Sequence, residues 1–338
     1  MVSKPFSVND HKLKTTVLLG DPRLPDPVKL NGQFNQEDIE MVDEIKSSLA
    51  LLTEFEFTYL DDHQNLLTDL QKSQPQFVFN LCDEGFNNLA THELHVPALL
   101  ELMNIPYTGA GPACLALCFD KSAVRAIAQS LNIPVPNEAF VMPLDGIPSI
   151  LQFPVIIKPN VGDGSIGITQ NAVVHNQAML EERLQEVQKL LPNTSMLIQE
   201  YLTGPEYSVG ILGNPGNYEV LPLLEVDFSA LPSHLPKILA YEQKWQFDSD
   251  YYTQIKFKGA ELPAQVENEL IAYSFLLFER LGCRDFARFD FRADANGTIK
   301  LLEANPNPSG LSPMADLAGI TYEQLFEKVL HAAMARYR

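Results

Sequence analysis

A turn signal near the carboxyl end of the chain constrains the fold more than any other feature of the sequence. The segment FARFDFRADANGTIKLLEAN, residues 286–305, contains the dipeptide Asn296-Gly297 between two runs with alternating apolar and polar residues. Asn-Gly flanked by such runs is the strongest short-range indication of a two-residue type I′ turn. The segment is therefore expected to form an antiparallel hairpin.

The expected register brings acidic side chains together on one face of the hairpin. Side chains alternate along a strand, so Phe289, Phe291, Leu302 and Ala304 are expected on the opposite, core-facing side. Opposed residues have Cβ atoms about 4.5–5.5 Å apart, where like charges are destabilising. Two carboxylates at that range share a proton or a cation. Counted outward from the turn, the expected pairs are Ala295–Thr298, Asp290–Glu303 and Arg288–Asn305.

A hard divalent cation suits this pair of carboxylates. Mg²⁺ is typically held by one or two carboxylates and by substrate phosphates, and Asn305 offers another oxygen ligand. The structural alternative is that Asp290 and Arg288 form a surface ion pair while Glu303 is solvated. The opposed acids, the neighbouring Asn305 and the stiff segment NPNPSG favour a metal site, with Mg²⁺ or Mn²⁺ held by Asp290, Glu303 and Asn305.

A glycine-rich loop, Gly162 to Gly167, matches the pattern GxGxxG. A dinucleotide-binding loop would lead directly into a helix, whereas here ITQNAVV follows, which is rich in β-branched residues. The loop is therefore expected to join two strands and to act as a flap whose backbone N–H groups close over phosphates. Lys158, just before it, is placed to meet a phosphate. The alternative is a flexible hairpin tip beside a solvated lysine.

Strands and helices alternate over the first part of the chain, which predicts a mostly parallel sheet there. Strands are expected at 14–20 and in FEFTYL and FVFNL, with helices at 37–52 and in HVPALLELM. Asp120 is expected to cap a helix that begins DKSAVR. The loop 231–250 is long enough to serve as a lid, and no role is predicted for the loop 21–36. The predicted domains are residues 1–118, 119–204 and 205–338.

The overall composition argues for a globular protein that does not bind nucleic acid. Hydrophobic residues make up 46% of the 338 residues, which is ordinary for a packed core. The formal charge of −19 argues against nucleic acid, because phosphate contacts need clustered lysine and arginine. Because no apolar run reaches about 18 residues, no membrane span is expected, and a cytoplasmic location is the default. The cysteines Cys82, Cys114, Cys118 and Cys283 lack metal-binding spacing and are expected to be reduced structural thiols.

From about Asn80 onward the chain resembles the ATP-grasp enzymes and, within them, the D-alanine–D-alanine ligase family. The resemblance is carried, in order, by LLELMNIPYTGAG, DKSAVR, VIIKPNVGDGSIG, IQEYLTGPEYSVGIL, GCRDFARFDF and LLEANPNPSG. It implies an α/β, three-domain ATP-grasp fold in which an N-terminal parallel α/β domain precedes two α+β domains that hold ATP between them. It also implies an ADP-forming carboxylate–amine ligase. A homodimer is common in the family.

The resemblance carries functional roles onto individual residues of this sequence. Arg288 matches the arginine that stabilises the oxyanion of acyl transfer. Lys244 matches the lid lysine that reaches the transferred phosphate. Ser165 matches the flap residue near the γ-phosphate. The hinge Gln199-Glu200-Tyr201-Leu202 would meet adenine through its backbone. The remaining implied ATP contacts are Lys121, Lys158 and Gly164 for the phosphates and Glu206 for the ribose, while Asp290, Glu303 and Asn305 match the magnesium ligands.

The amino-acid pocket departs from the family pattern. The N-terminal segment that usually carries a substrate-binding glutamate reads LLGDPRLPDPVKLNG, the flap keeps one serine, and Trp245 follows the lid lysine. The loop after Asn305 is several residues shorter than usual. With these departures, the chain resembles the ligases of mycosporine-like amino acid pathways. Those ligases couple an amino acid such as serine or threonine to a cyclohexenone acceptor. The implied substrate residues are Trp245, Ser309, Gly310 and Ser312.

Two other functions compete with this interpretation. The first is a D-alanine–D-alanine ligase with a reshaped site, and the second is a nucleotide-binding scaffold without turnover. The complete set of Lys158, Arg288, Asp290, Glu303 and Asn305 argues against the scaffold, because a degenerate site usually loses a ligand first.

Overall fold

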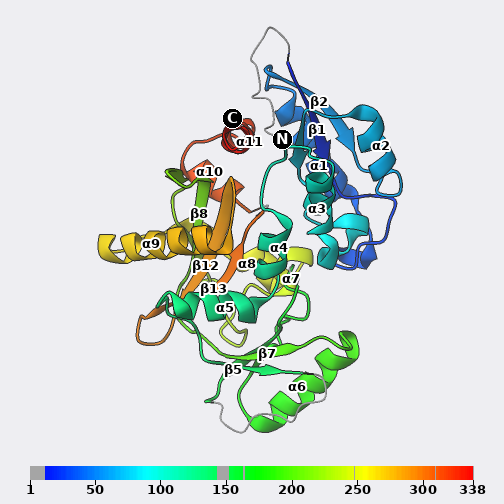
Figure 1. Ribbon diagram of the computed structural model, residues 1–338. Helices are drawn as coiled ribbons and strands as arrows, with labels where there is room; N and C mark the ends of the chain where they lie inside the picture. Colours follow the sequence, from blue (N-terminus) through cyan, green and yellow to red (C-terminus); the bar gives the residue numbers. More distant parts are fainter. Residues whose placement is uncertain (1–11, 143–151, 163, 247, 309, 338) are drawn as a thin grey trace.

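The computed structural model describes residues 12–142, 152–162, 164–246, 248–308 and 310–337 (Figure 1). Within these ranges the strands form three sheets, ordered β2-β1-β3, β4-β7-β5-β6 and β11-β10-β8-β12-β13, with β9 added to β8. In Figure 1 the C-terminal sheet, with β8, β12 and β13, lies between the blue N-terminal part and the green central part. The predicted mixed α/β fold is confirmed. No helix in the described ranges has the length and apolar character to cross a membrane.

The N-terminal sheet is parallel, as predicted. β1 pairs with β2 on one side and with β3 on the other, and both pairings are parallel. Asn35 caps the first helix, because its side chain accepts the N–H groups of Glu37 and Asp38 while its own N–H donates to the Asp38 carboxylate. The elements are β1 (Leu13–Leu18), α1 (Gln36–Leu49), β2 (Phe55–Leu60), α2 (Leu66–Ser73), β3 (Phe77–Asn80) and α3 (His95–Leu102), with 3₁₀ turns at Leu30–Gly32, Phe86–Asn88 and Ala90–His92.

The central sheet is antiparallel and carries the glycine-rich loop between β5 and β6. Asp120 caps α5, as predicted, by accepting the N–H of Ala123. The strand expected directly after the loop is much shorter than predicted, because the backbone turns at 169–171 and only Val173–Val174 pair with β5. The elements are α4 (Pro112–Cys118), α5 (Lys121–Ser130), β4 (Glu138–Val141), β5 (Val155–Pro159), β6 (Val173–Val174), α6 (Gln177–Leu190) and β7 (Met196–Glu200).

The C-terminal sheet is antiparallel throughout and contains the predicted hairpin as β12 and β13. The predicted lid loop 231–250 contains the short helix α7 and the first residue of α8. The elements are β8 (Glu206–Asn214), β9 (Asn217–Val220), β10 (Leu224–Asp227), α7 (Tyr241–Trp245), α8 (Asp250–Gln254), β11 (Lys256–Gly259), α9 (Ala264–Leu281), β12 (Phe286–Ala293), β13 (Ile299–Asn305), α10 (Ser312–Leu317) and α11 (Tyr322–Ala335).

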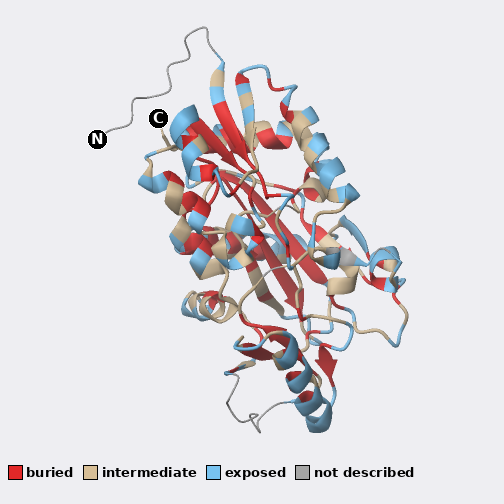
Figure 2. Ribbon diagram, turned by 90° about the vertical axis from the view of Figure 1, so that its right-hand side faces the viewer, coloured by how far each residue is buried: buried red, intermediate tan, exposed pale blue. Residues whose placement is uncertain are grey.

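The buried residues follow the strands through the molecule (Figure 2). One core cluster joins β1 and β3 to the C-terminal helix α11, where Phe79 and Phe326 meet edge to face with ring centroids 5.4 Å apart. A second cluster packs α4, α5 and α9 on the face of β8 and β12 that includes Phe289 and Phe291. Burying the aromatic face of β12 in this way leaves Arg288 and Asp290 on the other face, toward the candidate site.

Candidate functional site

The predicted pairing of the two acids is confirmed. Asp290 lies directly opposite Glu303, and Arg288 lies opposite Asn305, across β12 and β13. On the other side of β12, Asp290 lies opposite Ser208 of β8. The hairpin therefore presents two carboxylates and an amide next to each other on one face, as the alternation of side chains predicts.

The predicted turn, in contrast, is wrong. Asp294, not Ala295, is bonded to Thr298, so the loop has three residues, and only Gly297 takes a left-handed φ of +85°. The Asp294 carboxylate stabilises this loop by accepting the N–H groups of Asn296 and Thr298. A three-residue loop with glycine in the left-handed position is the next commonest hairpin connection.

A bulge at Leu302 explains why the acids still pair as predicted. Phe291 pairs with Leu301 and Asp290 with Glu303, so one residue of β13 is left over between them. The extra residue cancels the shift caused by the longer turn. Consequently Leu301, which is 3% exposed, takes the core position predicted for Leu302, which is only half-buried.

Asp290 is the centre of a hydrogen-bond network. The Arg288 guanidinium donates to both Asp290 oxygens, at 2.9 and 3.1 Å from Nε and 2.9 Å from Nη2. The Ser208 hydroxyl donates to Oδ1 at 2.6 Å. The Asn305 side-chain nitrogen lies 2.9 Å from Asp290 Oδ2 and 3.3 Å from Glu303 Oε1, so one donor lies between the two acids. Burial raises the pKa of Asp290, while Arg288 opposes the rise and Glu303 adds to it.

Glu303 lies among several positive charges that come from different parts of the fold. Burial favours its protonated form, but the charges of Lys121, Arg288, Lys244 and Lys158 outweigh burial and lower the pKa of Glu303 to about 2. Lys121 begins α5, Lys158 lies on β5 and Lys244 lies on α7. The structure therefore brings the predicted phosphate-binding lysines and the lid lysine to the predicted metal residues.

Lys158 and Lys121 lie side by side at the base of the glycine-rich loop. Lys158 is 7% exposed, and its burial together with the charge of Lys121 lowers its pKa to about 8. The Lys121 ammonium donates to the carbonyl of Gly162, and its backbone N–H donates to the carbonyl of Asn160 at 3.0 Å. Because the charge of Lys121 disfavours protonation of Lys158, an anion bound near both would relieve their repulsion.

The flap closes onto the lid loop. Ser165 has a left-handed φ of +60°, and its hydroxyl donates to the carbonyl of Leu239 at 3.1 Å. The N–H of Tyr241 donates to the carbonyl of Ile168 at 2.7 Å. Gly164 lies against Val28, since a Cβ added at the glycine would come within 2.6 Å of Val28 Cγ1. The predicted lid and the loop 21–36, for which no role was predicted, therefore both contact the flap.

The predicted hinge connects β7 to the next strand. The N–H of Glu200 is bonded to the carbonyl of Asn137, and that of Tyr201 to the carbonyl of Pro154. Among the described residues none accepts the N–H of Leu202. The side chains of Gln199 and Glu200 are used structurally, in a hydrogen bond to Glu138 and an ion pair to Lys300.

Glu206 is held by an arginine that the sequence analysis missed. Arg292 Nη1 lies 3.1 Å from Glu206 Oε2, and both side chains are less than 9% exposed. Burial raises the pKa of Glu206 to about 7, although Arg292 opposes the rise. Arg292 continues the alternation of Arg288 and Asp290 along β12, and that pattern could have identified it. Ser208, the partner of Asp290 on β8, was also missed, and nothing in the sequence pairs it with β12.

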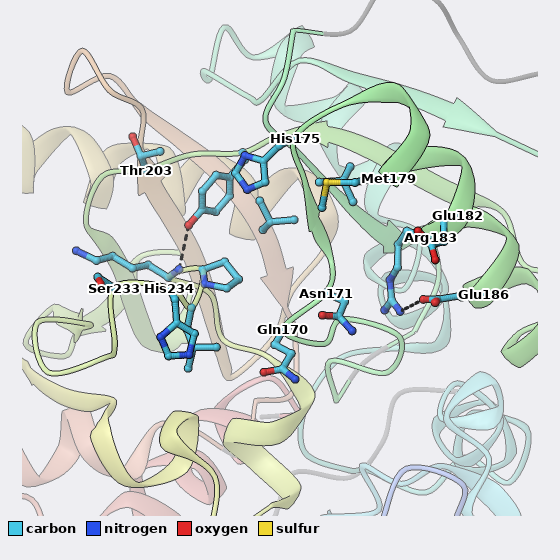
Figure 3. A pocket seen from close by; sticks show the side chains of 16 residues that line it. Gln170, Asn171, His175, Met179, Glu182, Arg183, Glu186, Thr203, Ser233 and His234 are labelled. Carbon is cyan, nitrogen blue, oxygen red and sulfur yellow. Dashed lines mark hydrogen bonds and ion pairs between the residues drawn. The ribbon is translucent and has the colours of Figure 1, made fainter.

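A cavity of about 720 Å³ lies beside the hinge, between the segment after the flap, α6 and the loop 233–237 (Figure 3). Tyr201 lines it, and its hydroxyl accepts the N–H of Lys237 at 3.0 Å. Arg183 on the α6 side pairs with Glu186 and donates to the carbonyl of Gly167, which ties the flap to the helix. None of the predicted metal residues lines this cavity, so it does not contain the acidic centre, the pair Asp290 and Glu303.

The predicted substrate residues are only partly brought to this centre. Gly310 lies against Arg288, because a Cβ at that position would be 2.6 Å from Arg288 Nη1. Ser312 begins α10. Trp245 is the last residue of α7, and Ser309 lies outside the described residues. The shortened loop is anchored by Asn307, whose side-chain oxygen accepts the N–H of Ala110 at 2.9 Å.

Comparison with known proteins places the chain in a family. The family model described as D-ala D-ala ligase C-terminus matches residues 140–331. The chain is 32% identical to the uncharacterized protein y4sG of Sinorhizobium fredii over 81% of this chain and 82% of that protein. It is 30% identical to the D-alanine–D-alanine ligase of Haemophilus influenzae over 76% of this chain and 86% of that enzyme.

A solved structure shares the fold. The D-alanine–D-alanine ligase of Bacillus anthracis complexed with ATP superposes with a TM-score of 0.72 and 20% identity, covering 96% of this chain and 98% of that one. The matched family region contains the central sheet, the hairpin and the lid loop, and the structural match extends to the N-terminal sheet. The chain therefore belongs to the D-alanine–D-alanine ligase family and is an ATP-dependent ligase of the ATP-grasp fold that uses ATP and Mg²⁺.

Proposed function

We propose that this chain is an ADP-forming carboxylate–amine ligase whose reacting groups meet at Asp290 and Glu303. The observation that carries the proposal is the facing pair of carboxylates on β12 and β13, surrounded by positive charges that include Lys121, Lys158 and Lys244. Carboxylates next to lysines suit a divalent cation and the phosphates of a nucleotide bound together. A purely structural ion pair between Arg288 and Asp290 would not require the three lysines as further positive charges.

The donor set fits Mg²⁺. Asp290 and Glu303 supply hard carboxylate oxygens, and the Asn305 amide nitrogen already lies between them, where a cation would lie. A half-turn of that amide would present its oxygen to the ion, because amide nitrogen and oxygen exchange places on rotation. Bound Mg²⁺ would neutralise phosphate charge during phosphoryl transfer.

The nucleotide would lie between the central and C-terminal sheets. Lys121 and Lys158 would contact its phosphates, and the flap with Gly164 and Ser165 would cover them. The N–H of Leu202 would bind the adenine edge. Glu206 would accept the ribose hydroxyls with its second oxygen, since Arg292 is bonded to Oε2.

Two steps would follow in one site. The γ-phosphoryl group would pass to an oxygen of the substrate acid, and ADP would leave, which converts a carboxylate into an acyl phosphate, or a vinylogous acid into its enol phosphate, with a good leaving group. The amine would then attack that activated carbon, and phosphate would leave as the C–N bond forms. Arg288 would hold the developing negative charge, and Gly310 leaves room for its guanidinium, because a Cβ there would lie 2.6 Å from Nη1.

The acceptor is proposed to be specialised rather than D-alanine. The bond from Ala110 to Asn307 and the departure of the segment after Asn305 from the family pattern support a rebuilt amino-acid pocket. A serine- or threonine-like amino acid and a mycosporine-type vinylogous acid are the proposed substrates. The name of the Haemophilus influenzae relative favours the second candidate, a D-alanine–D-alanine ligase.

ADP release measured over a panel of substrates separates these functions. The panel contains amino acids of both hands, each tested alone and with a mycosporine-type acceptor, in the presence of ATP and Mg²⁺. Turnover only with the acceptor present supports the specialised ligase. Turnover with D-alanine alone would favour the second candidate, and tight ATP binding without ADP from any combination would overturn the proposal of a ligase.

A further inference from the structure

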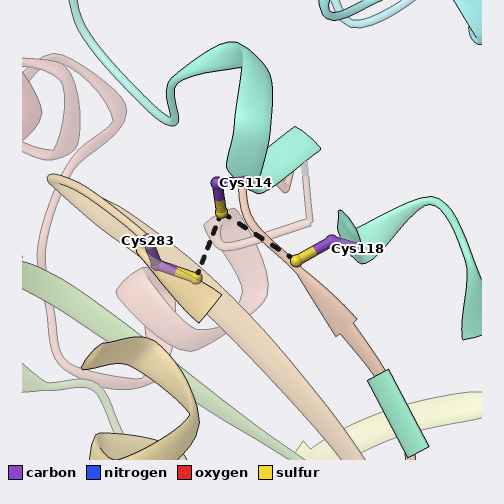
Figure 4. A group of neighbouring side chains, drawn as sticks. All are labelled: Cys114, Cys118 and Cys283. Carbon is purple, nitrogen blue, oxygen red and sulfur yellow. Dashed lines mark hydrogen bonds between the residues drawn. The ribbon is translucent and has the colours of Figure 1, made fainter. Parts of the chain in front are cut away.

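Three of the cysteines gather in the buried cluster on the core side of β12, the face opposite the two acids. Cys114 and Cys118 lie one turn apart on α4, and Cys283 follows α9 (Figure 4). Cys114 Sγ lies 3.9 Å from Cys118 Sγ and 3.8 Å from Cys283 Sγ, and all three sulfurs are within 4.8 Å of one another. Reduced structural thiols were predicted here, because the cysteines form no CxxC pair and have no histidine partners at metal-binding spacing.

The backbone fixes the three thiols from two directions, by α4 and by the end of α9. Residues four apart on a helix lie on the same face, which places Cys114 above Cys118. Gly282 ends α9 with a left-handed φ of +77°, and the N–H of Cys283 then donates to the carbonyl of Phe278 at 2.9 Å. The cluster is thus formed by a helix and a capped helix end, which are rigid supports, and not by loops.

The sulfur spacing matches the coordination shell of a thiophilic ion. A zinc–sulfur bond of about 2.3 Å gives sulfur–sulfur distances of about 3.8 Å in a tetrahedral site. Two of the three distances have this value, and a rotation of the partly exposed Cys118 would shorten the third. No histidine or carboxylate among the described residues joins the group, so the donor set is entirely sulfur and excludes Mg²⁺.

The surroundings favour a divalent ion over a monovalent one. Three thiolates with a divalent ion carry a net charge of −1, and Arg284 supplies a nearby positive charge, with its guanidinium packed against Gly111 just before α4. A monovalent ion would leave a charge of −2 in the apolar cluster that includes Cys114 and Cys283. Burial of that larger charge is the less favourable arrangement.

We propose that Cys114, Cys118 and Cys283 bind one thiophilic divalent d¹⁰ ion, Zn²⁺ or its congener Cd²⁺. Binding would release the three thiol protons to solvent and form three metal–sulfur bonds. The ion would join α4 to the segment after α9, where the N–H of Gly109 also donates to the Asp285 carboxylate at 2.7 Å. Because the folded chain forms the site and the unfolded chain does not, bound ion should stabilise the fold.

Cadmium titration of the full-length, chelator-treated, reduced protein tests the proposal. The wild type is expected to bind one Cd²⁺ with the ultraviolet absorption of cadmium–thiolate bonds and to unfold at a higher temperature when loaded. Cys118→Ser should weaken binding by at least about 100-fold. Substituting even a residue that only hydrogen-bonds to a metal ligand lowers metal affinity about 10- to 100-fold. Cys82→Ser is the matched control, because Cys82 is buried elsewhere beside His63, and it should bind like the wild type.

A second measurement needs no variant and covers the case in which Cys118→Ser does not fold. X-ray absorption at the cadmium edge counts sulfur neighbours, and three are expected in the loaded wild type. Absence of binding, equal binding by Cys118→Ser, or a cadmium shell without sulfur would overturn the proposal. Loss of two free thiols in air, without metal uptake by the reduced protein, would also overturn it and indicate a disulfide instead.

Discussion

Arg292 and Glu206 face each other across β12 and β8 and form a buried ion pair, with Nη1 and Oε2 3.1 Å apart. The guanidinium lies near two aromatic rings, 5.7 Å from the centroid of Tyr201 and 5.2 Å from that of Phe228. Its Nη2 is buried, and no described residue accepts its hydrogen bond. An unpaired donor beside the predicted ribose-binding acid is costly unless a ligand completes the site.

Arg292→Met should therefore weaken nucleotide binding more than chemistry. A hydrogen bond to a charged group contributes about 1.5–3 kcal/mol, so we expect the KM for ATP to rise about 10- to 100-fold with kcat little changed. Steady-state kinetics of ADP release measure both constants. Arg280→Met, at an exposed position on α9, is the matched control. An unchanged KM for ATP in Arg292→Met would show that the pair is only structural.

Lys158 gives the site a pH dependence of known sign. Its pKa of about 8 lies below the ordinary value of lysine, because burial and the charge of Lys121 disfavour the protonated form. Phosphate binds the protonated amine of Lys158. Raising the pH above 8 deprotonates this amine in the free protein, so fewer molecules can bind phosphate through it. The Kd for ATP, measured by calorimetry, should increase by up to about tenfold per pH unit above 8.

Lys158→Arg provides the control for this pH effect. Arginine stays protonated, so the variant should lose the alkaline weakening while still binding ATP. The same pKa has a consequence for folding. Because the folded pKa lies below the unfolded one, charged Lys158 destabilises the fold below pH 8, and stability from this group is regained as pH rises from 8 toward 10.5. If wild type and Lys158→Arg weakened alike above pH 8, another group would be responsible.

Glu303→Gln should remove metal-dependent turnover while the protein stays folded. The low pKa of Glu303 keeps it ionised at all working pH values, so the variant removes a full negative charge from the metal site. A metal contributes several kcal/mol of transition-state stabilisation, and we expect kcat to fall by at least about 10²-fold. ADP release measures the loss of turnover, and circular dichroism measures whether the variant stays folded. Glu219→Gln, at an exposed acid of β9, should behave like the wild type.

Lys244 tests the lid. It is exposed on α7, and its charge helps to lower the pKa of Glu303. Lys244→Ala should lower kcat by about 10²-fold with a smaller effect on ATP affinity, because a charge aimed at the transferred phosphate acts mainly in the transition state. Lys256→Ala, an exposed lysine outside the lid, is the control. Equal loss in both variants would indicate a general effect of surface charge.

The sequence predicts much of the site because the pairing of Asp290 with Glu303 depends on local rules. Alternation of side chains and the burial of Phe289 and Phe291 place Asp290 on the open face, and the bulge at Leu302 keeps Glu303 opposite it despite the longer turn. The turn was predicted wrongly because Asn-Gly also fits a three-residue loop, which the Asp294 carboxylate selects here. The bulge at Leu302 could not be predicted, since it arises from fitting two strands to that loop.

Features that join distant segments were beyond prediction. The contact of Val28 with the flap at Gly164 and the meeting of Cys114 with Cys283 depend on tertiary packing, which no local pattern encodes. The length of β6 was overestimated for a related reason. The β-branched residues after the flap have strand propensity, but the backbone turns before Val173, and only two residues reach the sheet.

The most direct test of the account is where a metal ion binds when nucleotide is present. Crystals of the full chain with ADP and Mn²⁺ would locate the ion by its anomalous scattering. The account predicts a peak within coordination distance of both Asp290 and Glu303, with the Asn305 oxygen turned toward it and Arg288 displaced from at least one Asp290 oxygen. A nucleotide bound with no such peak between the two carboxylates would contradict it.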